Sequence, residues 1–162
     1  MIQENDLPNE KPVKSRNSVY TTFSNIVFIK IAKEFLFKKH VNESEALDVL
    51  KYGFNIYKVT KKSKLTKCVL IQSETNQIEL KIIENKKISK FFLTQIDSIS
   101  FDSYIIKNNE NLGSSVNLNH FITIVLTNVS YNFIFLDNMH LEYFIFSILY
   151  FYELNYLENE NL

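Results

Sequence analysis

Tryptophan is absent from this 162-residue chain, and cysteine, glycine and proline are scarce. The single cysteine, Cys68, excludes a disulfide framework within the chain and fits a reducing compartment. The two glycines, Gly53 and Gly113, lie far apart, so the chain has no glycine-rich loop of the kind that cradles phosphate. Both prolines fall in the first 17 residues, a polar stretch without periodicity that we expect to be a disordered tail.

An excess of charge of one sign is also missing. The 18 lysines and arginines balance 18 aspartates and glutamates, giving a net charge of +0. Bulk charge therefore predicts no nucleic-acid partner, and any anion binding must come from local clusters. The N-terminal "MIQENDLPNE" has no signal-peptide core. The longest strongly apolar run, "YFIFSILYFY", is about half the length that spans a bilayer. We expect a protein that is cytoplasmic or lies peripherally on the cytoplasmic face of a membrane.

Residues that would support catalysis are not grouped. His40, His120 and His140 are scattered and show no paired metal-ligand spacing, and the carboxylates lie mostly in loops and tails. Cys68 falls in an expected strand with no base nearby in sequence, so we interpret it as a buried core thiol and not as a nucleophile. The sequence predicts no enzyme, no metal and no cofactor.

Two helices are expected in the N-terminal segment 18–52. Apolar residues at helical spacing predict the first, from about 20 to 39, although its front half also fits a strand. Asn42 lies three residues before Glu45, a pattern typical of a helix start, and Gly53 is a good stop. A second, short helix is therefore expected at 43–51.

From Gly53 onward the chain is rich in short, mostly alternating apolar segments separated by polar turns. They predict about seven strands, and hence a mainly β fold, an antiparallel barrel or sandwich: "FNIYKV", "KCVLIQS", "QIELKII", "ISKFFL", "DSISF", "FITIVLT" and "YNFIFLD". The polar insert between Phe101 and Phe121 is expected to be a mobile surface loop. A final helix of about four turns, with Asn138 as its N-cap, closes a domain at 53–155, followed by a tail at 156–162.

This order of elements resembles a pleckstrin-homology (PH) domain. The resemblance rests on "GFNIYK" and "KCVLI" for the first two strands, "ISKFFLTQIDSISFD" for the middle, and "ITIVLTNVSYNFIFLDNMHLEYFIFSIL" for the closing strands and helix. The family's usual helix tryptophan is missing, so Phe144 or Phe146 would take its place. The helical lead-in is similar to apicomplexan PH-like proteins of the acylated PH-domain and inner-membrane-complex sub-compartment type. Many of those begin Met-Gly and are acylated, whereas this chain begins Met1-Ile2, which does not support myristoylation.

The lysine-rich stretch "KVTKKSKLTK" lies between the first two expected strands. In the PH family, basic residues at this end of the barrel hold phosphoinositides, and alternation puts Lys58 on the inward face with Phe54 and Ile56. The resemblance implies a site for a phosphoinositide or phosphatidic acid formed by seven residues: Lys58, Lys61, Lys62, Lys64, Lys67, Lys86 and Lys87. The alternative interpretation is a solvated hairpin tip that binds nothing.

The final helix is apolar on nearly all sides and must be covered on more than one of them. One hypothesis is that the barrel and the first helix bury it. The other is that Tyr143, Phe146 and Tyr150 face outward and bind a protein partner or a second copy, since exposed aromatic residues anchor interfaces effectively. The leading function predicted is a non-catalytic, membrane-peripheral adaptor that binds anionic lipid. The alternative is a protein-interaction scaffold that binds no lipid.

Overall fold

A computed structural model describes residues 27–62, 64–102 and 120–160. The predicted tail at 1–17, the first part of the predicted helix 20–39 and most of the predicted mobile insert lie outside these ranges.

The two N-terminal helices are α2 (Val27–Leu36) and α3 (Glu43–Tyr52). Helix α2 ends earlier than predicted, and Lys38, just past its end, has a φ of 66°, which an α-helix does not allow. The predicted signals for α3 are confirmed. The Asn42 side chain accepts a hydrogen bond from the Glu45 N–H, and Gly53 ends the helix by donating its N–H to the Val49 carbonyl.

All seven predicted strands are present in the structure. Their alternation of apolar and polar residues puts one row of side chains into the core and the other outside. The strands are β1 (Phe54–Val59), β2 (Leu65–Gln72), β3 (Glu79–Glu84), β4 (Lys87–Phe92), β5 (Ile96–Ser100), β6 (Phe121–Leu126) and β7 (Ser130–Phe135). A short 3₁₀ helix, η1 (Leu93–Gln95), joins β4 to β5.

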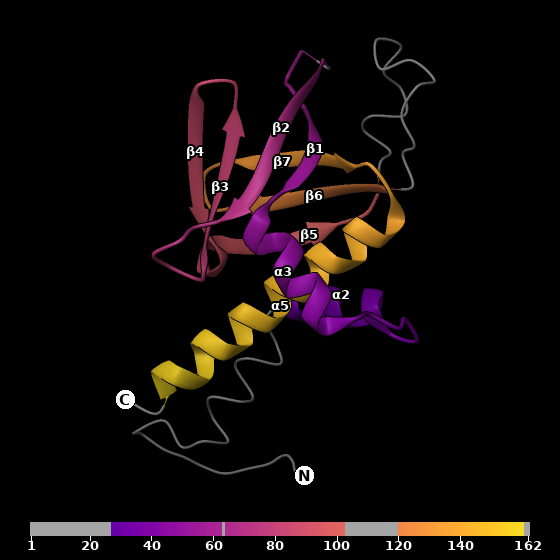
Figure 1. The fold of residues 1–162 in the computed structure, drawn as a ribbon, viewed down its shortest axis with the longest axis vertical. Coiled ribbons are helices and arrows are strands. Elements are labelled where there is room, and N and C mark those ends of the chain that lie inside the picture. Colours follow the sequence, from indigo (N-terminus) through magenta and orange to yellow (C-terminus); the bar gives the residue numbers. More distant parts are fainter. Residues whose placement is uncertain (1–26, 63, 103–119, 161–162) are drawn as a thin grey trace.

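The strands form one antiparallel sheet in the order β4-β3-β2-β1-β7-β6-β5. Strand β1 lies at the centre and pairs with β2 over its whole length, but it pairs with β7 only from Ile56 to Lys58. The short β1–β7 pairing lets the sheet bend strongly, so that β2, β3 and β4 run across the direction of β5, β6 and β7 (Figure 1). The predicted mainly β fold closed by a C-terminal helix is therefore confirmed.

Helix α5 (Asn138–Glu160) closes the bent sheet. Its N-cap lies one residue before the prediction, because the Asp137 carboxylate accepts a hydrogen bond of 2.7 Å from the His140 N–H. Asn138 instead donates a hydrogen bond from its side-chain amide N–H to the Glu142 carboxylate. The helix also continues past the predicted domain boundary at residue 155, so residues 156–160 are helical and not a tail.

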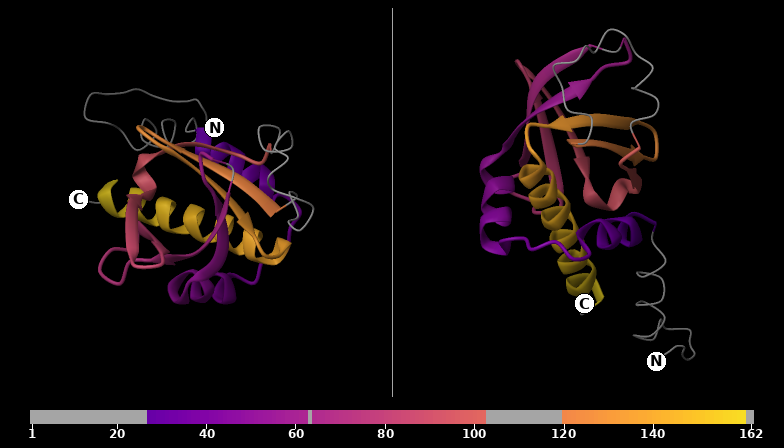
Figure 2. Two further views of the ribbon diagram at one scale, coloured as in Figure 1. Left: turned by 90° about the horizontal axis from the view of Figure 1, so that it is seen from above. Right: turned by 90° about the vertical axis from the view of Figure 1, so that its right-hand side faces the viewer.

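Helix α5 is buried on three sides. Phe144 packs edge-on against Phe54 and, tilted, against Phe135, and it is fully buried in the core. Helices α3 and α2 flank α5 (Figure 2, right). The buried Ser147 hydroxyl donates a hydrogen bond of 3.0 Å to the Ala46 carbonyl of α3, and Phe28 of α2 meets Tyr152 edge-on. The apolar character of α5 all round follows from this cover. One hypothesis named the barrel and the first helix, and α3 adds cover that it did not include.

Candidate functional site at the lysine-bearing hairpin tips

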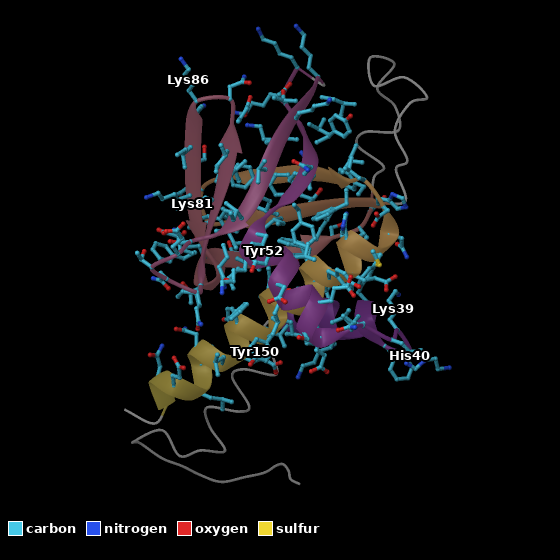
Figure 3. The ribbon with its side chains drawn as sticks, viewed as in Figure 1. Lys39, His40, Tyr52, Lys81, Lys86 and Tyr150 are labelled. Carbon is cyan, nitrogen blue, oxygen red and sulfur yellow. The ribbon has the colours of Figure 1, made fainter. Side chains whose placement is uncertain are left out.

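Two hairpin tips lie at the same end of the barrel. Two hydrogen bonds close the β1–β2 turn. The Thr60 N–H donates to the Lys64 carbonyl, and the Lys64 N–H donates to the Thr60 hydroxyl. The β3–β4 turn is tighter, because Glu84 pairs directly with Lys87 and only Asn85 and Lys86 lie between them. In Figure 1 both turns point the same way, and Figure 3 shows Lys86 at that end of the molecule.

Five of the seven predicted lysines are exposed at these tips. Three come from the β1–β2 hairpin and two from the β3–β4 hairpin: Lys61, Lys62, Lys64, Lys86 and Lys87. Between residues 58 and 67, and between 82 and 90, the sequence contains a single carboxylate, Glu84. A chain with no net charge therefore carries a local cluster of positive charge at one end.

Lys58 differs from the other lysines because it is held by a partner. Its ammonium group lies 2.5 Å from a Glu84 carboxylate oxygen, and the two side chains are only 20% and 23% exposed. Lys58 lies on the inward face with Phe54 and Ile56, as alternation predicted. The position is therefore the expected one, but the charge is already neutralised, which leaves less of it for a phosphate ligand.

Cys68 lies next to this ion pair in the core. Burial is the main effect on its thiol and raises the pKa to about 11, while the nearby Lys58 lowers it and Glu84 raises it further. A thiol with a raised pKa is protonated at neutral pH and is a poor nucleophile. The pKa agrees with the interpretation of Cys68 as a core residue.

Lys67 lies on the opposite face of the sheet from Lys58. In the β1–β2 register Lys58 pairs with Thr66, and Lys67 pairs with Tyr57 on the outer face. Lys67 lines a shallow cavity of about 310 Å³ together with Asn55, Tyr57 and the exposed Leu136. The structure therefore does not bring Lys58 and Lys67 to one binding surface, because neighbouring residues of a strand alternate between faces.

The three predicted interface aromatics of α5 have different environments. Tyr143 is 5% exposed and belongs to the core, so it cannot form part of an exposed interface. Phe146 is half-buried and lines a cavity of about 320 Å³ with residues of the α2–α3 connection, among them Lys39 and His40. Tyr150 stacks on Phe146 and is 40% exposed. Figure 3 shows Tyr150, Lys39 and His40 far from Lys86. Only Phe146 and Tyr150 remain as surface candidates.

A bent sheet of seven antiparallel strands closed by a C-terminal helix defines the class: the chain has a PH-like fold. Inner Membrane Complex Sub-compartment Protein 3 from Toxoplasma gondii is similar over 72% of this chain and 89% of its own, with 13% identity and a TM-score of 0.53. Sub-compartment Protein 1 of the same complex and organism is similar over 70% of this chain and 95% of its own, with 15% identity and a TM-score of 0.54. At such identities the likeness shows the fold alone.

A structure described as the PH domain from TgAPH covers 75% of this chain and 97% of its own, with 17% identity and a TM-score of 0.43. No protein-family model and no curated protein matches the sequence. In the described ranges, no helix has the length and apolar character needed to cross a membrane, and no group of three or more metal-ligating side chains is present.

Proposed function

We propose that this chain is a non-catalytic, membrane-peripheral module that binds anionic phospholipid through its two lysine-bearing hairpin tips. The observation that carries the proposal is the group of five exposed lysines at one end of the barrel, next to a carboxylate that Lys58 already engages. The PH-like fold supports a lipid- or protein-binding module in general.

Charge, more than headgroup shape, governs the proposed binding. The chain has no arginine at the tips, and lysine is a point charge without the planar fork that grips phosphate oxygens in pairs. Lys58, which lies on the inward face of β1, is held by Glu84. Phosphatidic acid and phosphoinositides therefore both fit, each in proportion to its negative charge.

The expected affinity is low. Lysines near an anionic surface contribute about 1 kcal/mol each, so five give about 5 kcal/mol and a dissociation constant of roughly 0.2 mM. A single domain of this kind attaches weakly and reversibly, and stable residence on a membrane needs a second contact.

Co-sedimentation with vesicles tests the proposal. The chain is mixed with neutral vesicles, with phosphatidic-acid vesicles and with phosphoinositide vesicles matched for total charge, at about 0.15 M salt, where loose attraction is screened beyond roughly 8 Å. Pelleting with both anionic kinds and not with neutral vesicles is expected. Absence of pelleting with all three would contradict lipid binding.

Protein binding at α5 is the second candidate function. The stacked pair Phe146 and Tyr150, beside the cavity that Lys39 and His40 help to line, is the observation that favours it. Tyr150→Glu is expected to remove a partner or a self-association without unfolding the domain, because Tyr150 is exposed. Sedimentation velocity, compared with the parent chain, measures the change in mass.

A further inference from the structure

The two edges of the sheet have different neighbours. Helix α2 packs along β5, and Phe35 of that helix stacks on Phe101, just past the end of β5, with ring centroids 4.4 Å apart. At the other edge β4 pairs only with β3 within the described ranges, so one row of its backbone N–H and C=O groups has no strand partner there. An unpaired edge is a template for a further strand.

The outward face of β4 carries an alternating pattern. Ile88, Lys90 and Phe92 project from the same face, and Phe91 between them is buried in the core. Ile88 is 54% exposed and Phe92 is 36% exposed. A solvent-facing row of side chains on an antiparallel strand is usually polar. Here one apolar side chain lies on each side of a lysine, which indicates a face that can bury them against a partner.

Lys90 also stands opposite a like charge. The β3–β4 register pairs it directly with Lys81, and like charges at directly opposite positions destabilise a sheet. Neither ammonium group lies in an ion pair with any carboxylate of the described residues, including Glu79, which lies on the same face two residues from Lys81. A carboxylate on a strand added beside β4 would neutralise the charge of Lys90 and so relieve the repulsion.

We propose that the β4 edge binds an extended segment of another protein, which adds to the sheet as an eighth strand. The segment has an acidic residue opposite Lys90, with apolar residues two positions before and after it to meet Ile88 and Phe92. Its backbone supplies the hydrogen bonds, and the alternate side chains supply the specificity. The proposal is independent of lipid binding, because it uses the edge of β4 with Ile88, Lys90 and Phe92 and none of the five tip lysines.

A fluorescent heptapeptide tests this. The probe is Thr-Val-Thr-Glu-Thr-Ile-Thr, and its matched control has the same composition with Val, Glu and Ile made consecutive, which breaks the alternation. Fluorescence polarisation is measured with the whole chain. We expect the alternating peptide to bind at least about tenfold more tightly than the control peptide. Equal binding of the two peptides, or no binding of the alternating one up to about 1 mM, would overturn the proposal.

A charge swap tests the register. Lys90→Glu is expected to weaken binding of the alternating peptide about tenfold or more, and a peptide with lysine in place of its glutamate is expected to bind this variant instead. Folding is not at risk, since Lys90→Glu replaces a like-charge pair with an opposite pair across from Lys81. Lys51→Glu, the same charge change on the exposed surface of α3, is the control and should leave peptide binding unchanged. If Lys51→Glu weakened peptide binding as much as Lys90→Glu does, simple charge attraction would explain the binding and the proposal would fail.

Discussion

Lys58 illustrates how one contact changes the meaning of a residue. Its place on strand β1 directs it toward the open end of the barrel, where a free ammonium group would meet a phosphate. The Glu84 carboxylate occupies that ammonium group, and both side chains are mostly shielded from solvent. The positive charge that this end of the domain would offer to a membrane is therefore that of the five exposed tip lysines, because Glu84 cancels the charge of Lys58.

Removing the carboxylate should strengthen membrane binding. Glu84→Gln frees the Lys58 charge, and one additional positive charge near an anionic surface contributes about 1 kcal/mol, or about fivefold in affinity. Vesicle co-sedimentation with phosphatidic acid measures the change. Glu79→Gln is the matched control, because it makes the same charge change at the other end of β3. Equal gains in the two variants would mean that net charge alone matters and that the Lys58–Glu84 pair has no special role.

The thiol of Cys68 gives a second test at the level of one residue. An ordinary thiol is half ionised at pH 9, whereas a pKa of about 11 leaves roughly one per cent as thiolate. Because the pKa is raised in the folded state, the thiol contributes stability that is present below pH 9 and is lost as pH rises through about 11.

We therefore expect native Cys68 to react with iodoacetamide at pH 9 at least about fiftyfold more slowly than the guanidinium-unfolded chain. Mass spectrometry of the alkylated fraction over time measures both rates. Similar rates in the folded and unfolded chains would show that the thiol is accessible to solvent and would contradict the buried position of Cys68.

At the scale of elements, the junction between α3 and β1 depends on one glycine. Gly53 has φ 103°, a conformation that side-chain-bearing residues rarely adopt, and a Cβ added there would lie 3.0 Å from a methyl carbon of Val69. The turn lets α3 end and β1 begin without a loop, which sets the position of α3 against α5.

Gly53→Ala is expected to lower the free energy of unfolding by about 1–3 kcal/mol, because it adds backbone strain and a tight contact. Urea denaturation followed by circular dichroism measures this change. Asn55→Ala, an exposed position on β1, should change the free energy of unfolding by less than about 0.5 kcal/mol. A Gly53→Ala variant as stable as the parent chain would contradict the described turn.

The elements of this chain were readable from its sequence, and their partners were not. Alternation and turn residues are local signals, so the seven strands, the Asn42 cap and the inward direction of Lys58 followed from them. Glu84 meets Lys58 only because β2 lies between β1 and β3 with a fixed register, and no local pattern specifies that. Tyr143 was misplaced because a helix that is apolar on all sides gives no period from which to choose its exposed face.

At the scale of the whole molecule, the proposed functional surfaces lie at separate places. Lys86 of the lysine tips lies at one end and Tyr150, on which Phe146 stacks, lies near the other (Figure 3). The β4 edge runs along the side (Figure 1). A domain arranged in this way can touch a membrane and a protein at the same time. Two weak contacts held together by one rigid domain give a combined affinity well above either alone.

The central claim is that the two hairpin tips act together on an anionic membrane, and a set of tip variants tests it most directly. One variant carries Lys61→Gln, Lys62→Gln and Lys64→Gln, another carries Lys86→Gln and Lys87→Gln, and a third combines all five. Binding to phosphatidic-acid vesicles is measured for each, with Lys30→Gln and Lys51→Gln together as a control on the exposed surfaces of α2 and α3. Each tip variant should bind more weakly, the combined variant should not bind, and the control should match the parent chain. Undiminished binding of the combined variant, or an equal loss in the control, would contradict the claim.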